Sequence, residues 1–244
     1  QRRALNPALR SYSRMVVANR GEGVAGFASR VTFSRSLPMT NEEARPDQLD
    51  PDTKKDDHRR PSIATYSGVE FFPLSPRVED VRIMDIAQAL SMKCRYTGQC
   101  HQFNSVAQHS VFVSEILEHL KQPIEVQYIG LMHDTSEAYL PDVASPIKGH
   151  LEGFRDIENR LEACIAKAFN YQYPFPKMVK VADAEAFKHE YKQIMSNLAW
   201  WKGDPPRYDW GHMEEWGPLV AREKFLLRHR RLTAERIPGV PVIP

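Results

Sequence analysis

The chain has 244 residues, a formal net charge of +2 and 42% hydrophobic residues, which suits one domain with a packed core plus appendages. No apolar run approaches the ~20 residues that a membrane-spanning helix requires. Three cysteines without C-x-x-C spacing indicate neither a disulfide framework nor a zinc ribbon. We therefore expect a cytoplasmic protein in a reducing compartment.

Residues 1–60 differ in composition from the rest of the chain. Seven arginines and one acid, Glu22, precede Met39, and residues 41–60 are almost all charged or polar. Such a stretch buries too little apolar surface to offset the entropy lost on ordering. The composition predicts a disordered tail over 1–60. A targeting segment, a nucleic-acid-binding arm and an extension upstream of a start at Met39 all fit it, and we favour the extension.

The signals of ordered secondary structure begin after this tail. Residues 65–76 combine aromatic and β-branched residues with glycine and prolines, which predicts a short strand or hairpin. Residues 85–93 predict a first helix. A second helix is expected over 105–120, because Ser105 is a good N-cap and an apolar stripe follows it.

Four more segments carry helical patterns. Residues 125–140 place apolar side chains at helical spacing and stop at a proline, and residues 155–169 show one apolar stripe. Residues 177–195 and 218–232 are expected to be helices that begin with a proline in or next to the first turn.

These segments together define the expected fold class. The sequence predicts an all-α bundle of about six or more helices, with a minor β element near residues 66–72. The ordered domain is expected to span 61–237 and to be followed by a C-terminal tail, 238–244.

The dipeptide His133-Asp134 is the most informative local feature. Adjacent side chains on an α-helix diverge by about 100°, so they converge only on a point beside the helix. A divalent metal is the usual reason for such convergence. With His109 and Asp183 the dipeptide makes a borderline N/O ligand set suited to Mn, Fe, Co, Ni or Zn. For the dipeptide alone, a buried histidine beside a locally pairing aspartate is the alternative.

Three strings in order carry a resemblance to a known family: RYTGQCHQFNSVAQHS (95–110), LMHDTSEAYLPDVASPIK (131–148) and VKVADAEAF (179–187). They resemble the HD-domain phosphohydrolase superfamily, and most closely the small bacterial 5′-deoxynucleotidases and the phage dNTP (dATP) triphosphohydrolases. The resemblance spans about residues 66–232. It implies a metal-dependent phosphohydrolase, and the related enzymes suggest a homo-oligomer.

Glu137 is the expected catalytic residue. A metal held by the ligand set would lower the pKa of a water and polarise a phosphoryl oxygen. Glu137 lies four residues after His133, so on a continuous helix it would share that face without being needed as a ligand. We therefore predict that it accepts or donates the proton. The alternative is a carboxylate on the helix surface.

Cations and an aromatic residue complete the expected site. Arg95 is the first candidate for phosphate binding, since a guanidinium can bind a phosphate in bidentate fashion. Lys148 and Lys180 match lysines that look like phosphate contacts in the resembled phage enzymes, although singly each could be a solvated surface residue. Tyr96 stands where the resembled enzymes tend to carry a Trp against the deoxyribose. Gly98 offers no side chain to shape the base pocket.

The expected function is metal-dependent hydrolysis of (deoxy)nucleoside 5′-phosphates. Two lysines beyond Arg95 favour a dNTP triphosphohydrolase, and a 5′-deoxynucleotidase that releases inorganic phosphate from dNMPs is the alternative. A cyclic-nucleotide phosphodiesterase is disfavoured because the extra histidines of binuclear sites are absent apart from His150. A non-catalytic nucleotide- or nucleic-acid-binding protein ranks low, since every proposed ligand is present.

The expected cofactor is one divalent transition metal (Co, Mn, Zn, Ni or Fe), with Mg as a companion of the substrate phosphates. The expected partners are a nucleotide substrate and further copies of the chain. We expect neither a membrane nor a nucleic acid among them.

Overall fold

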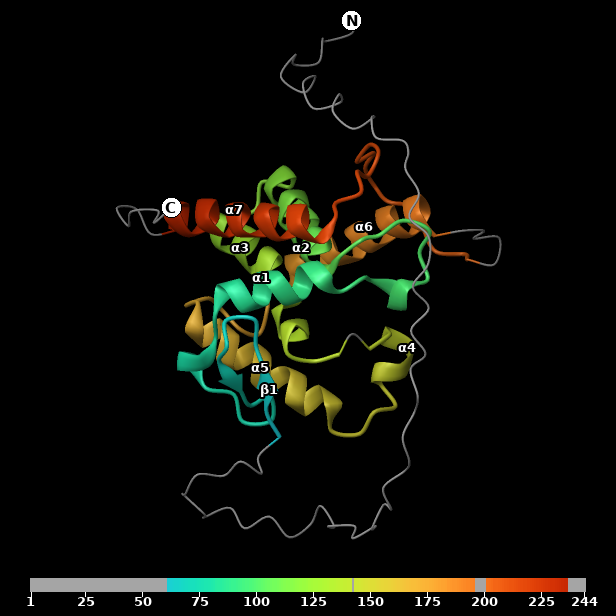
Figure 1. The fold of residues 1–244 in the computed structure, drawn as a ribbon. Coiled ribbons are helices and arrows are strands. Elements are labelled where there is room, and N and C mark those ends of the chain that lie inside the picture. The colour runs from blue at the N-terminus through green and yellow to red at the C-terminus, as the bar shows by residue number, and fades with distance from the viewer. Residues whose placement is uncertain (1–60, 142, 196–200, 237–244) are drawn as a thin grey trace, which may run out of the picture. The chain divides into compact units, whose positions relative to one another are not determined.

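The computed structural model describes residues 61–141, 143–195 and 201–236, which form seven α-helices and one minimal hairpin (Figure 1). The predicted tails, 1–60 and 238–244, lie outside these residues. The predicted all-α class is confirmed. Among the described helices, none is long and apolar enough to cross a membrane.

The β element comes first in the described chain. Strand β1 (Ile63–Ala64) pairs antiparallel with β2 (Glu70–Phe71), and the turn between them carries Gly68 at φ +83°. Phe71 is fully buried, and its ring stacks on that of Tyr139 with centroids 3.8 Å apart. The predicted β element near 66–72 is therefore confirmed, with its strands on either side of the turn.

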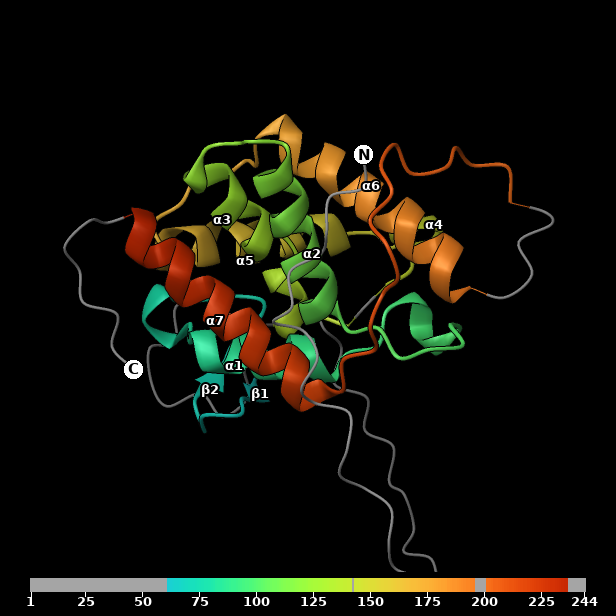
Figure 2. The same ribbon diagram turned by 90° about the horizontal axis from the view of Figure 1, so that it is seen from above.

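Helix α2 is the centre of the bundle and packs against α1, α3, α6 and α7. Seen from above, α7 lies across α1 and alongside α3 (Figure 2). The helices are α1 (Ile83–Met92), α2 (Val106–His119), α3 (Ile124–Met132), α4 (Ser145–Lys148), α5 (Phe154–Ala168), α6 (Lys177–Ile194) and α7 (Pro218–Arg236).

Two residues explain where α2 begins and how closely α3 packs against it. The hydroxyl of Ser105 accepts a hydrogen bond from the backbone N–H of Gln108 at 3.1 Å, which confirms the predicted N-cap. Helix α3 approaches α2 closely at Gly130, where a Cβ would come within 2.3 Å of the Leu117 Cδ1 atom. The missing side chain thus allows the two helices to come together near His109 and His133.

The prediction of one helix across 125–140 is wrong beyond Met132, where α3 ends. The His133 ring donates from Nδ1 to the Gly130 carbonyl at 2.8 Å, and the Thr135 hydroxyl donates to the Met132 carbonyl at 2.7 Å. A continuing helix would bond these carbonyls through backbone N–H groups instead. Side chains take their place, and the chain leaves the helical path.

The chain continues as a short 3₁₀ helix, η4 (Thr135–Ala138), after Asp134 at φ −103° and ψ 16°. The short helix α4 was not predicted, whereas α1, α5 and α6 begin and end within two residues of the predicted bounds. Helix α7 runs four residues past the predicted end to Arg236. There the Arg236 guanidinium pairs with Glu125 and lies 4.0 Å from the ring centroid of Tyr128.

Candidate metal centre and adjoining pocket

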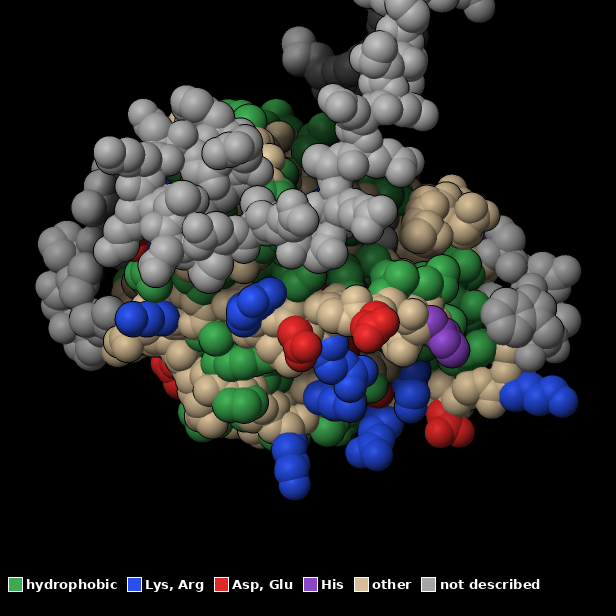
Figure 3. All heavy atoms as spheres, turned by 90° about the horizontal axis from the view of Figure 1, so that it is seen from below, with side chains coloured by type: hydrophobic (Ala, Val, Ile, Leu, Met, Phe, Trp, Pro, Cys, Tyr) green, Lys and Arg blue, Asp and Glu red, His purple; other side chains and the backbone are tan. Residues whose placement is uncertain are grey.

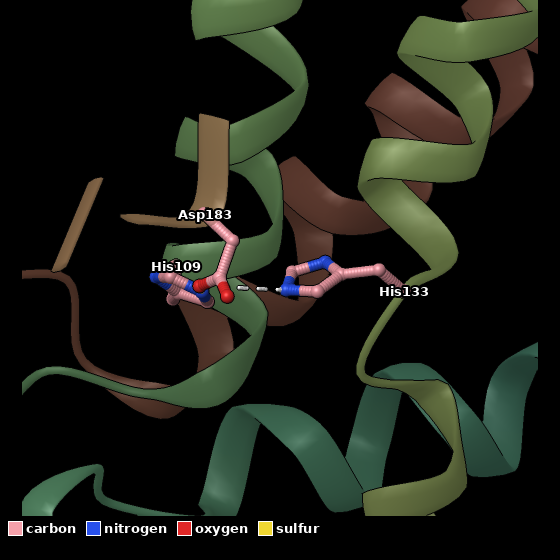
Figure 4. A group of neighbouring side chains, drawn as sticks. All are labelled: His109, His133 and Asp183. Atoms are coloured by element: carbon pink, nitrogen blue, oxygen red, sulfur yellow. Dashed lines mark hydrogen bonds and ion pairs between the residues drawn. The ribbon is translucent and has the colours of Figure 1, made fainter. Parts of the chain in front are cut away.

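Three helices each contribute one side chain to a cluster in the core. His109 lies in the first turn of α2, His133 caps the end of α3, and Asp183 lies in the middle of α6. Their donor atoms are all within 4.8 Å of one another, and both histidines are buried. The Asp183 carboxylate lies between the two imidazoles (Figure 4), with Oδ1 3.1 Å from His109 Nε2 and 3.9 Å from His133 Nε2. This group can hold a metal ion.

The break after α3 brings Asp134 to the same cluster. Its Oδ2 atom lies 3.2 Å from His133 Nε2 and 3.6 Å from His109 Nε2. On a regular helix Asp134 would diverge from its neighbour by about 100°, but the non-helical backbone at this position lets both side chains face the same side. The structure therefore brings all four predicted metal ligands together.

The hydrogen bonds of the two imidazoles leave their Nε2 atoms facing the carboxylates. His133 Nδ1 donates to the Gly130 carbonyl, and His109 Nδ1 lies 2.8 Å from the Glu190 Oε1 atom. Within the described part of the chain, the buried His133 Nε2 atom makes no well-aligned hydrogen bond, although the Asp134 and Asp183 carboxylates face it. A metal-ligating histidine typically binds through one nitrogen while its other N–H is held in this way. The donor set therefore fits a divalent ion.

The electrostatics of the cluster favour positive charge between the imidazoles. Burial alone would lower the pKa of His133, but Asp134 and Asp183 outweigh it and raise this pKa to about 9. Burial would raise the pKa of Asp134, yet His133, His109 and Arg95 hold it well below its usual range. Two ionised carboxylates facing two ring nitrogens require either a proton or a metal ion between them.

Glu190 is the residue that the sequence analysis missed. It is fully buried, and its Oε2 atom accepts from the Tyr96 hydroxyl at 2.9 Å and lies 3.1 Å from Arg95 Nε, while Oε1 faces His109. Burial opposes its charge, but Arg95 and His109 lower the pKa of Glu190 to about 2. The available signal was its spacing, since seven residues after Asp183 is two helical turns on the same face.

The loop that carries Arg95 and Tyr96 has an unusual backbone. Tyr96, Thr97 and Gly98 have φ angles of +57°, +51° and +74°, a left-handed run that non-glycine residues rarely adopt. A backbone hydrogen bond of 2.9 Å from Arg95 N to Asn104 O closes the base of the loop. Together with the Tyr96–Glu190 bond, this closure holds both side chains toward the centre.

A pocket of about 650 Å³ adjoins the cluster, a volume common for small-molecule sites. The predicted site residues that line it are Arg95, Tyr96, Asp134, Glu137, Lys148 and Asp183. Glu137 reaches it from η4, so its position does not follow from the continuous helix that was expected.

The two predicted phosphate-binding lysines are placed differently. Lys148 lines the pocket, but its Nζ atom pairs with Glu158 Oε1 of α5 at 2.6 Å. Lys180 lines a second hollow of about 640 Å³, together with Lys177 and Lys188 of the same helix. The structure therefore does not bring Lys180 to the cluster. Gly98 is in the loop but is not among the residues that line the first pocket.

No protein-family model matches the chain. The chain is similar to an uncharacterized Escherichia coli K12 protein, YfdR, with 36% identity over 121 residues, which are 50% of this chain. It spans 65% of the length of that relative. The relative is itself uncharacterized, so the similarity assigns no chemistry to the site.

Proposed function

We propose that this chain is an HD-type metal-dependent phosphohydrolase acting on deoxynucleoside 5′-phosphates. The observation that carries the proposal is a cluster of two imidazoles and two carboxylates at the wall of a pocket that is also lined by a partly buried arginine, Arg95. Such a reaction requires a set of metal ligands and, next to it, a cation that binds the phosphate.

The ligand set indicates which ion would bind. Two ring nitrogens and two carboxylates suit Mn, Fe, Co, Ni or Zn, and such an ion supplies Lewis acidity and a more acidic water. The residues around the ligand set orient the two imidazoles. Glu190 and the Gly130 carbonyl fix the orientation of His109 and His133 before any ion binds.

Arg95 is the proposed phosphate-binding residue. Its Nε atom faces Glu190 at 3.1 Å, and its NH1 atom is 3.8 Å from the Asp134 carboxylate. The guanidinium therefore lies beside a metal ligand, where it can neutralise a phosphoryl oxygen and position the phosphorus. Glu137 lines the same pocket and is the proposed proton acceptor or donor.

The number of phosphates on the substrate separates the two proposed activities, dNTP triphosphohydrolase and 5′-deoxynucleotidase. The preference for dNTP rested on Lys148 and Lys180, and the latter lines a different hollow while the former is paired with Glu158. With fewer cations for a long phosphate tail, hydrolysis of dNMPs to inorganic phosphate becomes the better-supported activity. Release of triphosphate from dNTPs is the second candidate.

Nucleic acid remains the less favoured ligand. On the face shown in Figure 3, lysine and arginine side chains are interspersed with acidic ones over the described elements. Proteins that bind nucleic acids usually present a basic patch or stripe. This mixed face favours a small nucleotide over a nucleic acid as the ligand. A cytoplasmic location and a homo-oligomeric state remain part of the proposal because the resembled enzymes suggest them.

A substrate panel tests the proposal. The parent protein is incubated with dNMPs, dNTPs, NMPs and NTPs in Mn, Co, Mg or Zn, and the products are separated by chromatography. We expect inorganic phosphate from dNMPs, none from His133→Ala, and parent-like turnover from Lys177→Ala, which removes a cation from the second hollow. Metal binding without turnover of any nucleotide would overturn the proposed function.

A further inference from the structure

Phe187 is a large apolar side chain that remains exposed inside the site. Its exposed fraction is 37%, although its neighbour Ala186 on α6 is fully buried. Phe187 lies four residues after Asp183, one turn along the same helix, and it lines the pocket that adjoins the metal cluster. Water-exposed aromatic surface beside a metal ligand is the kind of surface that a ligand covers.

Two tyrosines fix this ring in an aromatic wall. The Phe187 and Tyr191 rings are 5.1 Å apart at an interplanar angle of 32°, and Tyr96 lies 6.2 Å from Phe187 and 5.9 Å from Tyr191. Tyr191 is 9% exposed and contacts the ring of Trp201 at 5.2 Å. The Tyr96 hydroxyl is held by Glu190. Tyr191 and Tyr96 thus support the wall, and Phe187 offers its free surface.

The aromatic wall is next to the proposed phosphate-binding residue. The Arg95 guanidinium lies 5.2 Å from the centroid of the Tyr96 ring, and Arg95 and all three aromatic residues line the same pocket. A ligand that fits both features carries an anionic group and a flat ring at a short distance. A nucleotide has this composition, with the phosphate for Arg95 and the base for Phe187.

We propose that Phe187, backed by Tyr191, is the surface on which the nucleobase of the substrate stacks. The identity of the ligand as a nucleotide rests on the proposed function. Stacking on an aromatic face tolerates every base, because every base has a π-face. A purine covers more of the Phe187 ring than a pyrimidine does, so the site prefers purine over pyrimidine nucleotides.

The test compares two ligands that differ only in the base. Hydrolysis-resistant phosphonate analogues of dAMP and of 1,2-dideoxyribose 5-phosphate, in which hydrogen replaces the base, are titrated into the metal-loaded protein by calorimetry. In the parent we expect the dAMP analogue to bind at least about 10-fold more tightly, a factor within the range of one base–aromatic stack. Phe187→Leu should reduce this ratio to near one and leave the affinity for the base-free analogue unchanged.

Two further variants make the outcome decisive. Phe187→Trp keeps a flat ring and should retain the preference for the dAMP analogue. Val181→Ala removes an exposed apolar side chain of the same helix that lines the second hollow, and should behave as the parent. Equal affinity of the parent for both analogues, or an equal loss of both in Phe187→Leu, would overturn the stacking proposal. A base-dependent affinity without hydrolysis of any nucleotide would overturn the proposed function alone.

Discussion

At the scale of single residues, Glu190 connects groups with three different tasks. One carboxylate contacts the metal-ligand candidate His109, the phosphate-binding candidate Arg95 and the hydroxyl of Tyr96. Displacing it would therefore disturb the candidate metal centre, the proposed phosphate-binding residue and the loop at once. Buried carboxylates of this kind fix both the tautomer and the orientation of a ligating imidazole.

The Glu190→Gln variant tests this connection. The amide keeps the size of the side chain but removes the charge that faces His109 and Arg95. We expect metal affinity to fall about 10- to 100-fold, measured by titration against a competing chelator. The matched control is Glu185→Gln, because the Glu185 carboxylate is also buried in α6 but accepts from Arg207 N and Trp210 Nε1. An equal loss in both variants would mean that Glu190 only stabilises the fold.

Glu137 distinguishes proton transfer from metal ligation. Glu137→Gln removes the titratable group from the pocket wall and leaves Arg95 in place for the phosphate. We expect turnover to fall by about 10²–10⁴-fold with little change in KM, since general acid–base assistance has this magnitude. Metal content, measured by elemental analysis, should remain that of the parent. Loss of the ion would make Glu137 a ligand, and unchanged turnover would remove it from the reaction.

At the scale of elements, the approach of α3 to α2 sets the distance between the two histidines. Gly130 makes that approach possible, because an added Cβ would lie 2.3 Å from Leu117 Cδ1 and 3.5 Å from Val113 Cγ1. Leu117 and Val113 are fully buried, so neither can turn into open space. Helix packing and site geometry are thus coupled through one residue without a side chain.

Gly130→Ala should therefore be destabilising. Overpacking in a close-packed core typically costs 1–3 kcal/mol, so the free energy of unfolding should fall by about that amount in urea titrations. Gly149→Ala is the control, because a Cβ there meets nothing within 4 Å and the φ angle of −68° suits alanine. Equal stability of the two variants would show that α2 and α3 can separate at no cost.

The secondary-structure elements show how much of the fold could be predicted from the sequence. Apolar spacing, Ser105 and the prolines located the main helices, because burial and capping leave local patterns. The end of α3 at Met132 was missed, since it results from a competition between side chains and backbone N–H groups for the same carbonyls.

The candidate site was predictable to a similar degree. The four candidate ligands could be picked out because histidine and carboxylate side chains in helices with apolar faces are chemically conspicuous. Glu190 and the outward position of Lys180 were not found, because spacing along one helix does not say which neighbours face each side.

At the scale of the whole molecule, the cluster joins segments that are far apart in the sequence. His109, His133 and Asp183 come from α2, the end of α3 and α6, so one ion would link three helices of the core. A ligand that binds only the folded state stabilises it by mass action. Metal binding and folding should therefore be coupled.

Scanning calorimetry can measure this coupling. At a free ion concentration of 100 times Kd the gain is ~2.7 kcal/mol, which corresponds to a rise in Tm of roughly 5–10 °C for a domain of this size. We expect this rise for the parent with Mn, Co or Zn, and none for His133→Ala. An equal rise in the variant would mean that the ion binds elsewhere on the protein.

The break after α3 has a consequence for protein design. A histidine followed directly by an aspartate can be copied onto any ideal helix, but there the two side chains would diverge by about 100° and could not serve one ion. Transplanting this centre requires the residues that end the helix as well: the Gly130 carbonyl, which accepts a hydrogen bond from the His133 ring, and the Thr135 hydroxyl, which donates to the Met132 carbonyl. The smallest segment that can be transplanted is therefore the helix end together with its side-chain hydrogen bonds, rather than the dipeptide alone.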